Sequence, residues 1–359
     1  MSVFNFFENS LVFRTLAFGY SNARVKAMKQ SLFTEKDFKA MIALKSVEDV
    51  YSYLEKTEYR NDLVAVGSLS GRSVADLIEF ALTRNFSRVL SKVTKVSPSF
   101  VRNRVSSFFE RYDVNNVKVI LLGKHLGYSV DKIRQLIIEG GVISKGVIEK
   151  ALVAKTLRDA VLEFAGTPYG SAVAKGFAEY EKTKKIISLT EAIDYAYYSN
   201  VLGFSKKASF NSRLLLKVLK SQIDFKNVSN VLRAKQESLS ESKIFSLVVP
   251  NGNIPLEVFR RASEAKSVED AAKQFSKYFD FSSALVEYSK SKSIIAFELA
   301  MEKSFSQKSL SFFRSSVLSV DAIIGFVLLK ELEISNVRKI VRAKEFGISE
   351  DRLSVMVAV

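Results

Sequence analysis

The sequence contains no cysteine, a single histidine and only four prolines among its 359 residues. The absence of cysteine excludes disulfide bonds, thiolate nucleophiles and cysteine metal ligands, and it fits an intracellular setting. One histidine, His125, is too few for most zinc sites and for a histidine-based catalytic triad. Because proline breaks helices, its scarcity favours long helices and argues against a loop-rich sandwich.

Long hydrophobic runs are also missing. No segment reaches the roughly 18 uninterrupted apolar residues that a membrane span needs. The longest apolar run, Ala322–Leu329, lies between Asp321 and Lys330 and predicts a buried helix. The apolar N-terminal segment 1–14 contains Glu8 and lacks both a basic leading region and a small-residue cleavage site, so we expect no signal peptide.

Charge of one sign is abundant. Lysine and arginine exceed aspartate and glutamate by 54 to 38, which gives a formal net charge of +16. This balance predicts a negatively charged partner: nucleic acid, anionic lipid head groups or an acidic protein face. The charge alone does not choose among the three.

Aromatic residues are numerous, with 28 phenylalanines and 13 tyrosines. They stand among aliphatic residues on stretches with helical periodicity, so we expect them to pack in a core rather than to stack on nucleic-acid bases. The residues singled out for this role are Phe80, Phe108, Phe109, Tyr197, Tyr198, Phe312 and Phe313.

One short segment occurs three times, as Lys45–Val50, Lys155–Ala160 and Lys266–Ala271, at steps of 110 and 111 residues. Each copy has a hydroxyl residue followed three residues later by aspartate, which is the spacing of a capping box at a helix start. The pairs are Ser46 and Asp49, Thr156 and Asp159, and Ser267 and Asp270, and the tyrosines that follow are Tyr59, Tyr169 and Tyr278.

A second segment occurs three times in the same order, as Asp113–Lys124, Asp224–Lys235 and Glu333–Lys344. Apolar residues at i, i+3 and i+4 predict one buried helix face in each copy. We expect the acid to begin this helix and the lysine to end it, since both placements favour the helix dipole. The serines expected to cap the following helix are Ser129, Ser240 and Ser349, and a weaker third marker is an acid at Glu79, Asp194 and Glu298.

Three markers at one period predict three copies of one helical domain. The boundaries we expect are residues 1–142, with an N-terminal extension, 143–252 and 253–359. Since each marker has the spacing of a helix cap or a helix face, each copy should be a helical bundle whose last two helices form a hairpin. The predicted fold class is therefore all-α.

No motif predicts catalysis, a cofactor or a metal ion. The segment Gly67–Ser73 has three residues between its glycines and then arginine, whereas a phosphate-binding loop needs four and then lysine. We interpret it as a loop before a helix over residues 75–83. His125 corresponds to Gln236 and Glu345 in the other copies, so it carries no chemistry that the copies share.

At this point the residues resemble a known family. Tyr20–Lys29 resembles the N-terminal signature of the C subunit of archaeal A-type and bacterial V-type ATP synthases, and the repeated hairpin and Gly347–Leu353 are similar to it too. The d subunit of eukaryotic V-ATPases is a more distant relative. The chain departs mildly from the pattern at Leu122, Gly123 and Lys26. The residues that match, with structural or interface roles unresolved, are Tyr20, Asn22, Arg24, Asn116, Lys124, Asn227, Lys235, Asn336 and Lys344.

The resemblance implies a function that composition and spacing do not. Members of the family are funnels or sockets of three similar helical domains in pseudo-threefold arrangement, on the cytoplasmic face of the membrane. They receive the central shaft, sit on the proteolipid ring and transmit torque between ion transport and ATP chemistry, without catalysing a reaction or binding a cofactor or small-molecule substrate. The positive charge would suit acidic ring loops or anionic lipid head groups.

Two other functions remain open at the level of the residues. The net charge also fits a helical-repeat protein that binds nucleic acid, whose basic residues should concentrate along one groove. An enzyme with carboxylate or lysine chemistry between the copies would need one copy to be polar where the other two are apolar, and no such difference is found.

Overall fold

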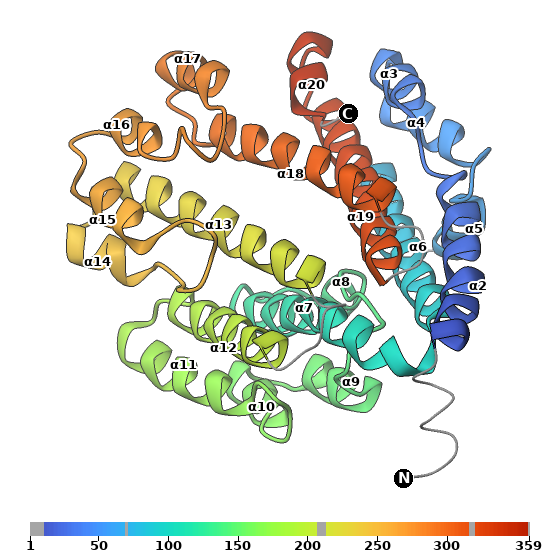
Figure 1. The fold of residues 1–359 in the computed structure, drawn as a ribbon, viewed down its shortest axis with the longest axis horizontal. Helices are drawn as coiled ribbons and strands as arrows, with labels where there is room; N and C mark the ends of the chain where they lie inside the picture. Colours follow the sequence, from blue (N-terminus) through green and yellow to red (C-terminus); the bar gives the residue numbers. More distant parts are fainter. Residues whose placement is uncertain (1–10, 69–70, 207–212, 316–319, 358–359) are drawn as a thin grey trace. The chain divides into compact units, whose positions relative to one another are not determined.

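The computed structural model describes residues 11–68, 71–206, 213–315 and 320–357 (Figure 1). Every regular element in these ranges is a helix, which confirms the predicted all-α fold. The helices, in chain order, are α2 (Leu11–Lys29), α3 (Glu35–Ala43), α4 (Val47–Leu54), α5 (Arg60–Val66), α6 (Val74–Val96), α7 (Ser99–His125), α8 (Val130–Arg134), α9 (Lys145–Val153), α10 (Leu157–Glu163), α11 (Gly170–Thr183), α12 (Ile187–Lys206), α13 (Arg213–Gln236), α14 (Glu241–Ser246), α15 (Leu256–Glu264), α16 (Val268–Lys273), α17 (Ser282–Ser291), α18 (Ile295–Ser315), α19 (Val320–Glu345) and α20 (Glu350–Met356).

The chain divides into two compact units. Unit 1 contains the described residues up to Val201 together with Phe313–Val357, and unit 2 contains Leu202–Phe312. Unit 1 thus joins the two ends of the sequence, while unit 2 is one continuous segment.

Helix α19 organises unit 1. It packs against α2, α3, α4, α6 and α7, so the C-terminal part of the chain lies beside helices from its N-terminal third (Figure 1). The predicted buried helix over Ala322–Leu329 is confirmed: Ala322 to Leu328 are buried and Leu329 is half-buried within α19. Burying a run of large aliphatic side chains contributes roughly 1.5–3 kcal/mol for each one.

Unit 2 has a core of its own, built on α13 and the short helices that follow it. Helix α13 packs against α14, α15 and α16. Aromatic rings fill the centre, with Phe259 and Phe275 centroids 5.3 Å apart and Phe281 and Phe297 centroids 5.2 Å apart. Such tilted and edge-on pairs are preferred by aromatic rings in protein interiors.

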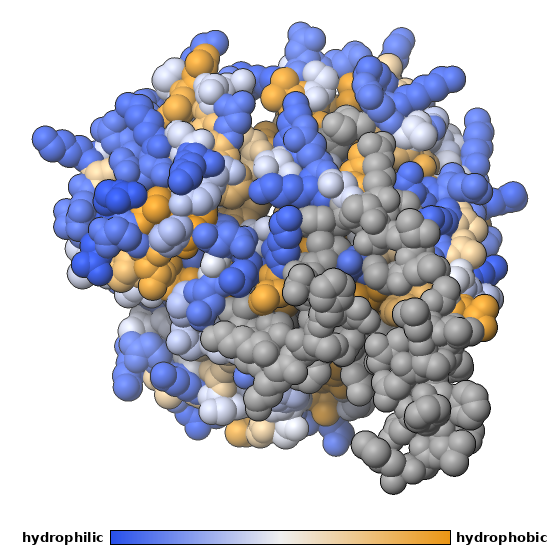
Figure 2. Space-filling model, viewed as in Figure 1, coloured by the Kyte–Doolittle hydropathy of each residue, from blue (hydrophilic) through white to orange (hydrophobic). Residues whose placement is uncertain are grey.

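The expected core aromatics are mostly confirmed. Phe80, Phe108, Phe109 and Tyr197 are buried, and Tyr198 is half-buried. The side chains of Phe312 and Phe313 lie outside the described part of the chain. On the face in Figure 2, hydrophobic residues are scattered among hydrophilic ones across the coloured surface.

The predicted helix caps are confirmed where their hydrogen bonds can be followed. Ser46 and Thr156 form reciprocal capping boxes with Asp49 and Asp159. Ser267 Oγ accepts a hydrogen bond from the Asp270 N–H at 3.0 Å. The serines predicted to cap the next helix all occupy the N-cap position, but only Ser129 makes the side-chain bond, whereas Ser240 and Ser349 do not.

The expectation that an acid begins each repeated helix is wrong. Helices α7, α13 and α19 begin at Ser99, Arg213 and Val320, well before Asp113, Asp224 and Glu333. The residues before each acid carry buried apolar side chains, such as Phe108 and Phe109 on α7, and their burial outweighs the favourable dipole position of an acid at a helix start. The other two expectations are confirmed, since each lysine lies in the last turn and the predicted apolar face is buried in all three helices.

The caps give a stability prediction. Thr156→Ala and Ser46→Ala should each lower the free energy of unfolding by about 1 kcal/mol, because each removes the acceptor for a first-turn N–H. Chemical denaturation followed by circular dichroism measures this loss. Ser349→Ala is the matched control, since Ser349 makes no cap bond, and a loss as large as that of Thr156→Ala would contradict the assignment.

Candidate functional site

The repeated acid, asparagine and lysine form the most distinctive polar constellation of the fold. Each set lies on one long helix, the acid first, the asparagine three residues later and the lysine eleven residues after the acid. We call each set a clasp. The three clasps are Asp113, Asn116 and Lys124 on α7; Asp224, Asn227 and Lys235 on α13; and Glu333, Asn336 and Lys344 on α19.

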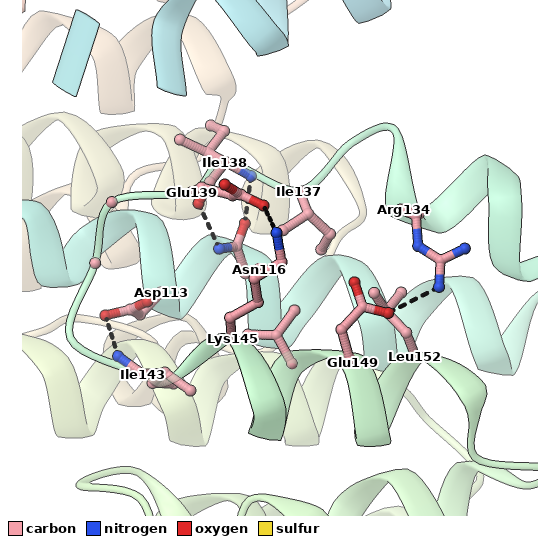
Figure 3. A pocket seen from close by; sticks show the side chains of 13 residues that line it. Asp113, Asn116, Arg134, Ile137, Ile138, Glu139, Ile143, Lys145, Glu149 and Leu152 are labelled. Carbon is pink, nitrogen blue, oxygen red and sulfur yellow. Dashed lines mark hydrogen bonds and ion pairs between the residues drawn. The ribbon is translucent and has the colours of Figure 1, made fainter. Parts of the chain in front are cut away.

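The clasp asparagine binds one backbone unit from both sides. Asn116 Oδ1 accepts from the Ile138 N–H at 2.9 Å, and Asn116 Nδ2 donates to the Ile138 carbonyl at 2.8 Å (Figure 3). Asn227 does the same to Val249, at 2.8 and 2.7 Å. Both asparagines are buried, as is Asn336 on α19. Only a primary amide can satisfy a backbone donor and acceptor in this way.

The clasp acid accepts backbone N–H groups from the same loop. Asp113 accepts from Val142 and from Ile143, the latter at 3.1 Å. The equivalent bonds in the other clasps run from the Asn253 and Ile254 N–H groups to Asp224, both at 3.0 Å, and from the Phe33 N–H to Glu333 at 2.6 Å. These bonds satisfy loop amides that would otherwise be buried without partners.

Glycines stand beside the two shorter acids. A Cβ atom at Gly141 would collide with the Asp113 carboxylate, and one at Gly252 with that of Asp224. The aspartate side chain is short, so the backbone must approach it closely. In the third clasp the longer Glu333 takes the place of aspartate, and the residue before Phe33 is leucine.

The clasp lysine donates to a carbonyl at the end of a short helix. Lys124 Nζ binds the Ala154 carbonyl at 2.5 Å, and Lys235 Nζ binds the Ser263 carbonyl at 2.6 Å. Lys344 Nζ binds the carbonyls of Ile42, at 2.8 Å, and Leu44. These oxygens belong to the last turns or C-caps of α9, α15 and α3, where carbonyls lack intrahelical donors and a cation is favoured.

The third sequence marker binds the same helices through its acids. Asp194 pairs with Lys118 at 2.8 Å, Glu298 with Arg233 at 2.7 Å, and Glu79 with Arg338 at 2.8 Å. The weakest marker in the sequence is therefore also an ion-pair partner of a clasp helix in all three cases.

The clasps show which segments each long helix holds. The α7 clasp binds residues 138–154, the α13 clasp binds residues 249–263, and the α19 clasp binds residues 33–44. These bonds cross the boundaries expected at 142 and 252. The division into residues 1–142, 143–252 and 253–359 stays a prediction.

The α19 clasp contains a buried ion pair. Glu333 Oε1 accepts from Lys330 Nζ and from the Tyr59 hydroxyl, both at 2.6 Å. Lys330 and Glu333 are 4% and 3% exposed, and Tyr59 is 1% exposed. Burial, followed by the charge of Glu333, raises the pKa of Tyr59 well above its ordinary value, so Tyr59 stays a neutral donor. Near the α7 clasp, Tyr169 donates to Glu110 at 3.1 Å.

A cavity of about 300 Å³ lies beside the α7 clasp (Figure 3). Arg134 pairs with Glu149 at 2.8 Å and Lys145 with Glu139 at 3.0 Å across its lining. These polar groups are paired with one another, which describes a tied loop better than a reaction site. In the part of the chain that the structure describes, no cluster of three or more histidines and acids could hold a metal ion.

The remaining candidate residues lie apart from the clasps. On α2, Asn22 is buried whereas Tyr20 and Arg24 are exposed, so the N-terminal signature combines a packing face and a surface face. His125 is exposed, with Nδ1 3.0 Å from the Tyr180 hydroxyl. In the segment Gly67–Ser73, residues 69–70 lie outside the described ranges, and Ser73 caps α6.

The sequence analysis did not find the backbone-binding role of the clasps or the buried Lys330 and Tyr59. One signal for the first was present. Gly141 and Gly252 each follow their aspartate by 28 residues, and an aligned glycine behind an aligned acid indicates a close backbone approach.

The comparison with protein families decides the identity of the fold. A family model described as ATP synthase (C/AC39) subunit matches residues 21–355. The chain belongs to this family. The repeated asparagines and lysines that carried the resemblance in the sequence are the clasp residues described above.

Curated relatives carry one name throughout. The chain is 26% identical to the A-type ATP synthase C subunit of Haloquadratum walsbyi over 338 residues, covering 93% of this chain and 96% of the relative. It is 28% identical to that of Halorubrum lacusprofundi, over 93% and 95% of the two chains. It is 25% identical to that of Methanocaldococcus jannaschii, over 91% and 82%. No helix among the described residues of this C/AC39 protein is long and apolar enough to cross a membrane.

The clasp asparagine can be tested in isolation. Asn116→Ala should lower the free energy of unfolding by roughly 2–3 kcal/mol, because it leaves a loop N–H and a carbonyl without partners. Amide exchange at residues 138–143 should speed up more than elsewhere in unit 1. Asn115→Ala is the matched control next to it, and equal effects of both variants would contradict the clasp.

The α7 clasp also predicts a pH dependence. Burial raises the pKa of Asp113 from 3.8 to about 6, because desolvation of the carboxylate outweighs its two backbone hydrogen bonds. Between these values the folded state binds more protons than the unfolded state, so the contribution of Asp113 to stability falls as pH rises from about 4 to about 6. Two pKa units correspond to roughly 3 kcal/mol.

Asp113→Asn should remove this slope. The free energy of unfolding of the variant, measured by urea denaturation at several pH values, should rise relative to the wild-type protein between about pH 4 and pH 6. Asp351→Asn, on an exposed acid of α20, serves as the control. A parallel pH profile for Asp113→Asn and the wild-type protein would show that Asp113 does not titrate in this range.

Proposed function

We propose that this chain is the C subunit of an A-type ATP synthase: a rotor adaptor that joins the central shaft to the membrane proteolipid ring. In this role it turns with both and transmits torque between ion transport and ATP synthesis or hydrolysis. The observation that carries the proposal is the family match over residues 21–355, together with relatives of that name covered almost end to end.

The clasps support a mechanical role. A torque-bearing protein must transmit force without letting its loops slide past its helices. Each clasp fixes a loop to the interior of a long helix through side-chain hydrogen bonds to the backbone, and the ion pairs of Lys118, Arg233 and Arg338 add a second attachment. The α19 clasp additionally ties the C-terminal helix to residues 33–44.

Three equivalent clasps also support the proposed architecture. We propose three homologous helical domains in pseudo-threefold arrangement around the rotor axis, with the protein peripheral on the cytoplasmic face of the membrane. It catalyses no reaction itself. Acidic faces of the shaft and ring, or anionic lipid head groups, would meet the positive surface.

Co-purification tests the proposal. A tagged copy, isolated from nuclease-treated, detergent-solubilised membranes of the source organism, should bring down shaft subunits and the proteolipid ring. Because the chain has no cysteine, a single cysteine at exposed positions such as Val286 or Phe346 allows cross-linking to neighbouring subunits without background. Cross-links to the ring should leave ATP hydrolysis intact, whereas cross-links to static subunits should stop it.

Recovery as a free monomer with bound nucleic acid would overturn the assignment in favour of the nucleic-acid alternative. The salt dependence of ring binding tests the electrostatic part separately. Binding should weaken steeply between about 0.1 and 0.5 M salt, since exposed charges are screened over about 10 Å or less in this range. A flat response would exclude acidic faces or lipid head groups as the main contact.

A further inference from the structure

Unit 1 contains a large groove that the clasps do not occupy. Its volume is about 870 Å³, and its lining comes from α5, α6, α8 and the loop after α8. The lining residues that carry the argument are Asp62, Arg84, Arg88, Lys92, Lys95 and Arg134.

One wall of the groove is a row of cations on α6. Arg84, Arg88, Lys92 and Lys95 follow one another at spacings of four, four and three residues. Such spacings place side chains on one face of a helix, and eleven residues of α-helix extend about 16 Å. Arg134, on α8, adds a fifth cation to the lining.

The groove cations are only partly neutralised. Buried Asp62 accepts from Arg88 at 2.7 Å and lies 3.7 Å from Arg84. Lys92 and Lys95 are exposed and form no ion pair with any residue in the described ranges. With Asp62 and Glu139 as the lining carboxylates, five cations face two anions, which leaves a net charge of +3.

The lining favours a protein partner over nucleic acid or a lipid surface. Single-stranded nucleic acid binds where exposed aromatic rings alternate with cations, but Phe80 is the aromatic residue of this lining and it is buried. A flat membrane would contact exposed rims, whereas here the cations line a hollow with hydroxyls between them, at Ser87, Ser91 and Thr94. Carboxylates on one face of a helix match a straight row of cations about 16 Å long.

We propose that the groove between α6 and α8 docks an acidic α-helix of a partner protein, with its carboxylates facing Arg84, Arg88, Lys92 and Lys95. Asp62 holds Arg88 in place at the floor, and Lys92 and Lys95 supply the unpaired charge. The proposal rests on the groove alone and does not require that the partner belong to a rotary complex.

The probe is a fluorescein-labelled, alanine-rich peptide of about 20 residues with glutamate at every fourth position, measured by fluorescence anisotropy at low salt. The test variant is Arg84→Gln/Lys92→Glu/Lys95→Glu in the full chain. The control variant is Lys243→Gln/Lys277→Glu/Lys290→Glu, which changes the net charge equally at exposed residues of unit 2. Thermal melting confirms that both variants fold.

The groove variant should weaken peptide binding at least tenfold, and the control variant less than threefold. Should the groove triple variant fail to fold, Lys92→Gln/Lys95→Gln replaces it, with an expected loss of at least threefold. Equal losses in groove and control variants, or no binding of the peptide, would overturn the proposal. So would groove-dependent binding of a single-stranded oligonucleotide or of phosphatidylglycerol vesicles in place of the peptide. A failed co-purification with shaft and ring leaves these outcomes unchanged.

Discussion

Hydrogen bonding of loop backbone by buried side chains is the constraint on which this fold depends. A protein made of many short helices has many helix ends and connecting loops, whose N–H and C=O groups lack partners within a helix. The clasps answer this with three kinds of side chain: a carboxylate that accepts, an amide that accepts and donates, and an ammonium that donates. Asp113, Asn116 and Lys124 satisfy loop residues 138–154 in this way, and the α13 clasp does the same for residues 249–263.

The clasp spacing follows from helix geometry. With 3.6 residues per turn, positions zero, three and eleven face nearly the same side of a helix. The apolar residues at the following positions, such as Val117, Ile120 and Leu121 on α7, lie beside them and are fully buried. The polar and apolar parts of the repeat therefore act on one surface, and the loop is held over the same core that the helix helps to build. This explains why acid, asparagine and lysine recur together with the apolar pattern.

The sequence predicted those features that depend on local spacing. The all-α fold, the buried face of each repeated helix, the lysine near its end and the caps at Ser46 and Thr156 follow from residues a few positions apart. The role of the acid was misjudged because its partner is a backbone amide 29 residues away, or 300 residues away for Glu333. A linear repeat also conceals that α19 binds the N-terminal residues 33–44. Only the paired glycines at 141 and 252 carried a trace of these approaches.

The buried ion pair of Lys330 and Glu333 shows what such contacts contribute. Removing two charges from water costs several kcal/mol for each ion, so a buried pair adds little net stability compared with well-packed apolar residues. Here, however, Glu333 also accepts from Tyr59 and from the Phe33 N–H, and Lys330 lies 4.4 Å from the centre of the Tyr59 ring. Any other pairing of α19 with the N-terminal segment would leave a buried charge without a partner, at a cost of roughly 3–5 kcal/mol. The network therefore selects one register between the two ends of the chain, and a fixed register is what a rotor protein needs to carry force without slipping.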